Sequence, residues 1–194
     1  MKPAVIFDFF GVFCAPIGTN WYKKHVSDTP DGLKTAQALF TESDYGRISR
    51  TDVHKKLSEM SGMPIAEVVA GIEAETHINE SLVAYVQQLK LKGYRIALLS
   101  NGTHEWTLQV IKEHGFADLF EQIVLSGDLG IVKPSPEIYL HTLRALKIEA
   151  QEALFVDDRQ PNVDAAEALG MHGLLFTDTR TFQRDFERLA AAKT

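Results

Sequence analysis

Short runs of hydrophobic residues alternate with longer amphipathic segments along most of the chain. A parallel strand that is covered on both faces carries few polar positions, so it forms a continuous hydrophobic run. The alternation of such runs with helix-length segments therefore predicts a parallel sheet wrapped by helices. The predicted strands cover residues 4–7, 95–99, 122–125, 153–156 and 173–176.

Helix start and stop signals lie between these runs. Asn79 can cap a helix that stops at Gly93, and similar signals predict helices over residues 103–115 and 161–170. Ser135 and the proline after it provide a cap and a favourable first-turn residue for a further helix. This strand–helix alternation predicts the α/β class, with a Rossmann-like, doubly wound parallel sheet.

The stretch over residues 15–78 breaks the alternation, because it contains no convincing strand. We predict a helical insertion there, placed after the first strand, and a core formed by residues 1–14 and 79–194. Within the insertion, helical periodicity is found at residues 33–40, 49–60 and 65–75.

Composition and charge indicate a folded protein and limit its expected partners and cellular location. Hydrophobic residues make up 45% of the 194 residues and charged residues 24%, which is typical of a folded protein. The net charge of -6 argues against a general nucleic-acid surface, and no hydrophobic run approaches the ~20 residues of a membrane helix. The lone Cys14 and the short N-terminal hydrophobic run suit a reducing compartment without a signal peptide. We expect a cytoplasmic protein without nucleic-acid or membrane partners; the pattern does not indicate an oligomeric state.

Polar residues stand where the predicted strands end. Asp8 follows the first strand, Ser100 the second, and Asp157 and Asp158 the fourth, while Lys133 follows the third before the next helix. Ligands of open α/β sheets bind outside the carboxyl ends of the strands. Each residue alone could be a turn cap or a solvated surface group, but their arrival at successive strand ends favours one shared site.

Acyl-phosphate formation is a chemistry that needs such a set. A carboxylate attacks the phosphoryl group, and a cation offsets the repulsion between the two anions. Mg²⁺ prefers one or two carboxylates, a carbonyl, water and the phosphate itself, and Asp8, the carbonyl of Phe10 and Asp158 could provide the protein ligands. Asp8 is the candidate nucleophile, with Lys133 as the positive charge that meets a phosphate oxygen.

Further groups around this site could bind the remaining phosphate oxygens. Gly11 and Gly102 would allow the backbone to approach the ligand closely. The candidate phosphate contacts besides Lys133 are the hydroxyl of Ser100 and the backbone N–H groups of Phe9, Phe10 and Asn101.

These motifs resemble, in order and over the whole chain, those of the haloacid dehalogenase superfamily of hydrolases. Residues 127–134, and 155–158 followed by Asn162, look most like the sugar-phosphate phosphatase branch that includes the alpha-D-glucose-1-phosphatases and like the phosphatase domain of soluble epoxide hydrolase. The resemblance implies a Mg²⁺-dependent phosphatase for a small phosphorylated metabolite such as a sugar phosphate. It also implies that residues 15–78 form a cap over the site.

The resemblance assigns further roles to individual residues. It makes Asp8 the nucleophile, Asp158 the second metal carboxylate, Asp157 a partner of Lys133 or of metal-bound water, and Asn162 a supporting residue. Substrate contacts are expected in the cap, where the candidates are Glu42, Tyr45, Arg47 and the helix start at residues 48–49.

Phe10 departs from the pattern of the family. Most phosphatases of the superfamily carry a second Asp at this position, which protonates the leaving oxygen and then activates water, and such help is worth roughly 10²- to 10⁴-fold in rate. A phenyl ring can do neither, so Phe10 is either core packing under the cap or a wall for the substrate. His104 and His25 are remote candidates for a substitute proton donor.

Three functions therefore compete. The first is a phosphomonoesterase that uses Asp8. The second is a 2-haloacid dehalogenase, whose motif has an aromatic residue at the position of Phe10 but which needs no metal and uses a cap arginine well before the position of Arg47. The third is a sugar-phosphate-binding regulator that has lost turnover, which the same Phe10 suggests.

Overall fold

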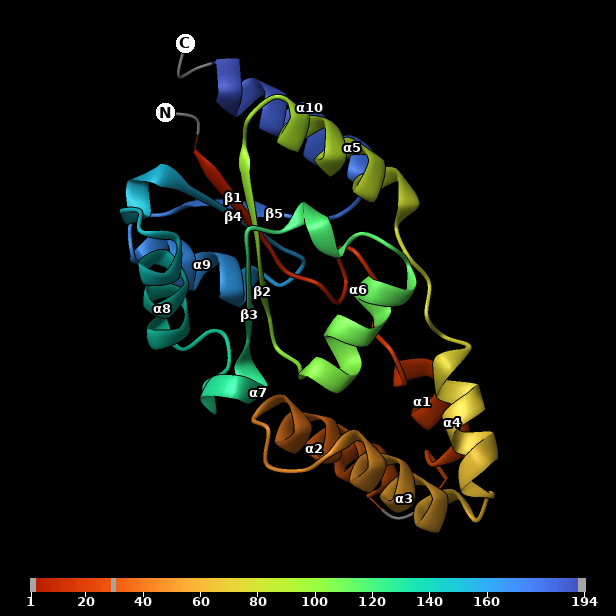
Figure 1. Ribbon diagram of the computed structural model, residues 1–194. Coiled ribbons are helices and arrows are strands. Elements are labelled where there is room, and N and C mark those ends of the chain that lie inside the picture. The colour runs from red at the N-terminus through yellow and green to blue at the C-terminus, as the bar shows by residue number, and fades with distance from the viewer. Residues whose placement is uncertain (1–2, 29–30, 192–194) are drawn as a thin grey trace.

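One parallel sheet of five strands forms the centre of the protein. The computed structural model describes residues 3–28 and 31–191. The strands follow the order β3-β2-β1-β4-β5 and all pair in parallel (Figure 1). Each strand begins and ends within one residue of its prediction, and the predicted α/β, Rossmann-like class is confirmed. The strands are β1 (Ala4–Phe7), β2 (Arg95–Ser100), β3 (Gln122–Leu125), β4 (Ala153–Asp157) and β5 (His172–Leu175).

Helices cover both faces of the sheet, which explains the continuous hydrophobic runs. Val5 and Phe7 pack in a cluster with residues of α5 (Glu80–Leu91), α6 (Gln109–Glu113) and α10 (Thr179–Ala191). Ala4 and Ile6 point to the opposite face and pack with α8 (Pro136–Leu146) and α9 (Gln160–Ala168). Successive strand side chains point to opposite faces, so a strand with helices on both sides must be hydrophobic at every position.

The edge strand β5 differs from its prediction as a buried strand. It pairs only with β4, and Leu175 keeps 39% of its surface exposed. Its burial comes mainly from α9, which packs closely enough that a Cβ on Gly173 would lie 2.6 Å from Val163 Cγ1. β5 is short and mostly apolar, so its sequence looks like that of an interior strand although only one of its faces is well covered.

Four helices lie between β1 and α5 and gather beyond the carboxyl ends of the strands (Figure 1). Three of them, α2 (Gly32–Asp44), α3 (Arg50–Ser61) and α4 (Ile65–Glu73), were predicted; α1 (Thr19–His25) was not. Ser49 begins α3 with a capping box in which it exchanges hydrogen bonds with Asp52. The assignment of residues 15–78 as a separate cap stays a prediction, and we use the word cap for this segment below.

A hydrophobic cluster of its own holds the cap together and ties it to the core. Residues of α1, α3 and α4 pack around Trp106, which belongs to the π-helical turn His104–Leu108 of the core. The indole N–H of Trp106 donates to Ser43 Oγ at 3.2 Å, and the guanidinium of Arg50 lies 4.6 Å from the centre of the indole ring. Trp106 therefore fixes the position of α2 and α3 relative to the sheet.

Two more helices were not predicted, α7 (Ser126–Leu129) and α10. α10 buries Phe182 and Phe186 against the sheet, and its other side is mostly polar apart from the exposed Leu189. Across residues 3–28 and 31–191, the helices are too short or too polar for any of them to span a membrane. The cytoplasmic location stays a prediction.

Candidate active site

Asp8 lies where the chain leaves the central strand. Its backbone N–H donates to the carbonyl of Val156 at 2.8 Å, which continues the pairing of β1 with β4 by one residue. The chain then turns, and the N–H of Phe9 donates to Asp8 Oδ1 at 2.7 Å. This turn holds the Asp8 carboxylate at the carboxyl edge of the sheet, where it is buried but lines a cavity.

Lys133 reaches the same point from the segment between α7 and α8. Its Nζ lies 2.7 Å from Asp8 Oδ1, 2.7 Å from Asp157 Oδ2 and 2.9 Å from the carbonyl oxygen of Leu99. An ammonium has three N–H donors, and here each has one acceptor. The charge of Lys133 is therefore buried, paired and aimed at the candidate nucleophile.

Asp157 is the fixed partner in this arrangement. Its two oxygens accept from the side-chain amide of Asn162 at 3.0 Å each, and Oδ1 also accepts from the backbone N–H of Arg159 at 2.9 Å. Of the two roles that the resemblance implied for Asp157, the structure shows the contact with Lys133. Asn162 supports it by hydrogen-bonding the Asp157 carboxylate.

The end of β2 holds the Lys133 segment in place. Asn101 accepts from the backbone N–H of Lys133 at 2.8 Å and donates to its carbonyl at 3.1 Å, while the N–H of Gly102 donates to Ser126 Oγ at 2.9 Å. Ser100 is fully buried, and its hydroxyl contacts the Asn101 carbonyl at 3.4 Å. Asn101 and Gly102 line the cavity and Ser100 is absent from the described lining. The phosphate contacts predicted for these residues and for the N–H groups of Phe9 and Phe10 stay predictions.

Three carboxylates could hold a cation at this edge. Asp8, Asp157 and Asp158 each place an oxygen within 4.8 Å of the others. Because Asp157 is occupied by Lys133 and Asn162, the two carboxylates open to the cavity are Asp8 and Asp158. This donor set fits Mg²⁺, which takes few protein carboxylates and completes its shell with carbonyl, water and phosphate oxygens.

Gly11 makes room for Asp158. Its φ of 91° is in the left-handed region, and a Cβ at this position would lie 2.3 Å from Asp158 Oδ2. Any side chain at residue 11 would therefore displace the carboxylate that completes the candidate metal site.

Burial sets the charge balance of the cluster. It raises the pKa of Asp8 to about 7; Asp157 adds to this rise, and Lys133 opposes it. The pKa of Asp158 is raised by burial and by Asp157. Burial would lower the pKa of Lys133, but Asp8 and Asp157 outweigh it and raise that pKa. A bound cation would favour the ionised carboxylates.

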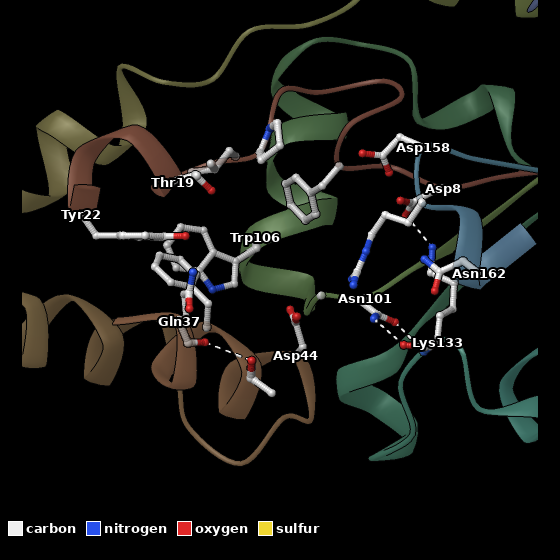
Figure 2. Close-up of a pocket in the computed structure, with 17 residues that line it drawn as sticks. Asp8, Thr19, Tyr22, Gln37, Asp44, Asn101, Trp106, Lys133, Asp158 and Asn162 are labelled. Carbon is white, nitrogen blue, oxygen red and sulfur yellow. Dashed lines mark hydrogen bonds and ion pairs between the residues drawn. The ribbon is translucent and has the colours of Figure 1, made fainter. Parts of the chain in front are cut away.

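A cavity of about 600 Å³ separates this cluster from the cap. Figure 2 shows Asp8, Asp158, Asn101 and Lys133 on one side and Tyr22, Gln37 and Trp106 on the other, with Asp44 of α2 pointing between them. We call the two sides the core wall and the cap wall. The core wall consists of Asp8, Asn101, Gly102, Lys133, Asp158, Arg159 and Asn162, and the cap wall of Phe10, Pro16, Ile17, Thr19, Tyr22, Gln37, Phe40, Thr41, Asp44 and Trp106.

Phe10 lies at the boundary of the two walls. Its ring contacts that of Phe9 edge-on at 4.9 Å between centres, and it packs against the hydrophobic clusters of both core and cap. It also lines the cavity. The two predicted alternatives, packing under the cap and a wall for the substrate, are therefore compatible in this structure.

Sequence reasoning missed two charged residues of the cavity, Arg159 and Asp44. Arg159 directly follows Asp158, and that adjacency was a usable signal. Asp44 ends α2, and its carboxyl is partly buried; burial raises its pKa to about 6, against the opposing charges of Lys133 and Arg159. A carboxylate at a helix C-terminus also faces the negative end of the helix dipole.

The cap residues that were predicted as substrate contacts lie outside the described cavity lining. Glu42 and Arg47 form an ion pair at 2.9 Å with both side chains largely exposed, and the guanidinium of Arg47 lies 4.3 Å from the centre of the Tyr45 ring. Ser49 is committed to the start of α3. These interactions stabilise the loop after α2, and the substrate contacts predicted for these residues stay predictions.

The two histidines considered as proton donors are also engaged elsewhere. His104 Nδ1 lies 3.0 Å from Asp128 Oδ1, with both side chains about half exposed. His25 packs on the ring of Trp21 at 4.9 Å. The described lining of the cavity includes neither.

Fold and site together define a class of α/β enzyme with an aspartate after the central first strand, a lysine paired to it, and an acidic pair after the fourth strand. The chain belongs to the haloacid dehalogenase-like hydrolases, whose family model matches residues 2–170. This confirms the predicted family and identifies the protein as a hydrolase of that superfamily.

Curated relatives include phosphatases. The sesquiterpene phosphatase astK of Aspergillus oryzae is 30% identical, with 91% of this chain and 90% of that protein aligned. The bifunctional epoxide hydrolase 2 of Sus scrofa is 27% identical over 98% of this chain, which spans only 39% of that longer protein. The phosphoglycolate phosphatase of Cereibacter sphaeroides is 29% identical over 66% of this chain and 57% of its own length.

Solved structures share the fold at lower identity. A HAD family enzyme of Bacteroides thetaiotaomicron superposes with a TM-score of 0.80 at 21% identity, covering 95% of this chain and 98% of the other. The same enzyme in complex with magnesium and inorganic phosphate gives a TM-score of 0.76 at 20% identity, covering 92% and 96% of the two chains. These matches show that the whole described arrangement of sheet and helices is a haloacid dehalogenase fold.

Proposed function

We propose that the chain is a Mg²⁺-dependent phosphomonoesterase that forms an aspartyl-phosphate on Asp8. The observation that carries the proposal is the buried Nζ of Lys133, 2.7 Å from Asp8 and 2.7 Å from Asp157, beside the open carboxylate of Asp158. In the fold family, magnesium and phosphate occupy a solved complex, and curated relatives are phosphatases. Bound Mg²⁺ would supply positive charge that lets an anionic nucleophile approach an anionic phosphate.

We assign separate roles in the reaction to the residues of the core wall and their neighbours. Asp8 Oδ attacks phosphorus from the sheet side, and the bond from phosphorus to the alcohol oxygen breaks toward the cap. Lys133 contacts an oxygen of the phosphoryl group and stabilises the charge that develops there, while Asp157 keeps its ammonium in place. Asp8 and Asp158, with the carbonyl of Phe10, hold the metal; Ser100 and the N–H groups of Phe9, Phe10 and Asn101 complete the contacts to phosphate.

The cap wall favours an alcohol with an apolar or aromatic part. Rings of Phe10, Tyr22, Phe40 and Trp106 and the side chain of Ile17 face the cavity and form the larger part of this wall. Thr19, Gln37, Thr41 and Asp44 add hydrogen-bonding groups to it. A sugar needs several fixed donors and acceptors, because each unpaired hydroxyl that is buried costs free energy. We therefore propose a small metabolite with an apolar alcohol in preference to a sugar phosphate. The name of the relative from Aspergillus oryzae, a sesquiterpene phosphatase, agrees with this preference.

A substrate panel tests the proposal. Phosphate release is measured from farnesyl phosphate, phenyl phosphate and glucose 1-phosphate, with Mg²⁺ and with excess EDTA. We expect turnover only with Mg²⁺, and the highest kcat/KM for the two apolar esters. Phosphate release that EDTA leaves unchanged would count against the Mg²⁺-dependent mechanism, and chloride release from 2-chloropropionate without metal would favour the dehalogenase alternative. Thermal stabilisation by Mg²⁺ and phosphate esters without any turnover would favour a binding regulator.

A further inference from the structure

The proposed mechanism lacks a proton donor for the leaving alcohol. Phe10 stands where the family resemblance implies a second aspartate, and its ring has no proton to give. The breaking bond points away from Asp8, toward the cap wall. The inference below rests on the proposed function, because it concerns the proton of that same reaction.

The charged residues of the described cavity lining offer one group for this task. They are Asp8, Asp44, Lys133, Asp158 and Arg159. Asp8 and Lys133 are paired with each other, and Asp158 is assigned to the metal. Arginine does not release its proton in proteins. Asp44 therefore remains as the candidate proton donor among these charged residues, and it belongs to the cap.

Two contacts with the core fix the helix end that carries Asp44. Its backbone carbonyl accepts a hydrogen bond from Ser126 Oγ, and Ser43 beside it accepts from Trp106. Just beyond, Gly46 approaches α7 so closely that a Cβ there would lie 2.3 Å from the carbonyl oxygen of Gly127. The position of Asp44 relative to the sheet edge is therefore set by the core, although the residue belongs to the cap.

The carboxyl group itself is available. Within residues 3–28 and 31–191, no side chain or backbone group hydrogen-bonds to it, and it points into the space between the two walls (Figure 2). Burial raises its pKa to about 6, so roughly a tenth of it carries a proton at pH 7. Lys133 and Arg159 oppose this rise, and a bound phosphate dianion would add to it.

Tyr22 of α1 also lines the cavity and packs on Phe40 of α2. Several other titratable groups of the elements packed on α2 face elsewhere. His54 of α3 packs edge-on against Trp106 at 5.3 Å, and Asp52 is hydrogen-bonded to Ser49. The remaining groups form pairs away from the cavity, namely Glu42 with Arg47 and Asp128 of α7 with His104.

We propose that Asp44 is the general acid and base of this enzyme, supplied by the cap in place of the aspartate that Phe10 replaces. As Asp8 bonds to phosphorus, the bond between phosphorus and the alcohol oxygen breaks, and Asp44 gives its proton to that oxygen. The alcohol leaves. Water then attacks the phosphorus of the aspartyl-phosphate while the Asp44 carboxylate takes a proton from it. Phosphate departs, and Asp8 and protonated Asp44 are restored.

Leaving-group dependence tests this role. The variant Asp44→Asn keeps the shape of the side chain and removes its acid. Phenyl phosphate and 4-nitrophenyl phosphate are nearly equal in size, but phenolate is the more basic leaving group, with a pKa near that of Tyr, about 10. We expect kcat/KM, which reports the step in which the alcohol leaves, to fall roughly 10²-fold or more for phenyl phosphate and only several-fold for 4-nitrophenyl phosphate.

A rescue experiment separates proton transfer from structural damage. Phe10→Asp places a carboxyl at the position where the family resemblance implies an acid, so adding it to Asp44→Asn should restore most of the lost kcat/KM for phenyl phosphate. In the wild-type background, where Asp44 already provides the proton, the same change should give no large gain in kcat/KM for this ester. Glu42→Gln, on the same helix, is the matched control, and it should not change the ratio between the two esters.

Three outcomes would overturn the role of Asp44. They are an equal loss for both esters in Asp44→Asn, no loss for either, or a large gain from Phe10→Asp alone. The first would show that Asp44 only binds substrate or shapes the cavity. Failure of the proposed function would be seen separately, because wild type would then release no phosphate from either ester, or Asp8→Asn would release it normally.

Discussion

The two walls of the cavity are built in different ways. On the core wall, Asp8, Asn101 and Lys133 have hydrogen-bonding or ion-pair partners. The ammonium of Lys133 contacts Asp8, Leu99 and Asp157 near the ends of three strands. On the cap wall, six of the ten side chains are aromatic or aliphatic, and the carboxyl of Asp44 has no described partner. The core wall is therefore charged and held by ion pairs and hydrogen bonds, and the cap wall is more apolar.

This difference suggests a division of labour. A transition state at phosphorus has the same charges for every ester, so one preorganised set of charges can serve all substrates. The alcohol varies, and contact with a larger or smaller hydrophobic group changes binding by only a few kcal/mol. We expect changes to the core wall to affect all esters alike, and changes to the cap wall to affect esters according to their alcohol.

The largest effect should come from the nucleophile on the core wall. Asp8→Asn keeps the side-chain shape but removes the attacking carboxylate, and we expect kcat to fall about 10⁴- to 10⁶-fold for every ester. Phosphate release at saturating substrate measures it, with Asp185→Asn on the far surface as the control. A loss of kcat that depended on the alcohol would contradict the claim that the core wall acts on all esters alike.

The second effect concerns the buried charge that holds the core wall together. Lys133→Met leaves the carboxylates of Asp8 and Asp157 buried without their cation, which should lower the free energy of unfolding by about 3–5 kcal/mol at pH near 8. Lys56→Met removes an exposed ion pair with Glu59 and should change the free energy of unfolding little. Urea unfolding compares the two variants. Equal costs would mean that the buried cluster is not the stabilising element we infer.

The third effect is a pH-dependent gain in stability on the cap wall. The pKa of Asp44 is about 6 in the folded protein against 3.8 in its ordinary range, so folding binds a proton and the native state loses stability as pH rises between these values. Asp44→Asn should therefore unfold with about 2 kcal/mol more free energy than wild type near pH 8, and with little difference near pH 4.

The groups that share the cavity with Asp44, namely Lys133, Arg159, Asp8 and Asp158, are unchanged in this variant. Urea unfolding at the two pH values measures the difference, with Glu42→Gln as the control. A variant that is less stable than wild type near pH 8 would show that Asp44 is held by a stabilising partner.

The smallest effect should come from the apolar part of the cap wall. Phe40 lines the cavity and lies 5.8 Å from the rings of both Tyr22 and Trp106. Phe40→Ala should raise KM for phenyl phosphate about 5- to 10-fold, near 1 kcal/mol, and leave KM for glycerol phosphate almost unchanged. Leu39→Ala, which shortens a neighbouring residue packed in the cap cluster, is the control. Equal shifts for both esters would argue that Phe40 does not contact the alcohol.

The core wall could be predicted from the sequence because its residues sit at the ends of parallel strands. Asp8, Ser100, Asp157 and Asp158 each follow a hydrophobic run directly, and parallel strands bring such ends to one edge. Lys133 was found by its place before a capped helix, although its contacts with Asp8 and Asp157 depend on the sheet order. At these positions the local sequence pattern also determines where the residue lies in the fold. Short motifs were therefore sufficient to predict these residues of the site.

The cap wall could not be predicted in the same way. Glu42 and Asp44 are two residues apart on α2 and therefore point in different directions, and the helix pattern does not say which direction faces the sheet. The structure places Asp44 in the cavity and Glu42 in an exposed ion pair. α1 is short and begins after Gly18 without a side-chain cap, so its start signal was weak.

The account depends most directly on a covalent bond between phosphate and Asp8. The enzyme is mixed with phenyl phosphate and Mg²⁺, quenched in acid within a turnover, and treated with borohydride, which reduces an acyl phosphate to an alcohol. Peptide mass analysis should then find homoserine at position 8, and none in Asp8→Asn or without Mg²⁺. Rapid phosphate release with an unmodified Asp8, or with the label on another residue, would contradict the central claim.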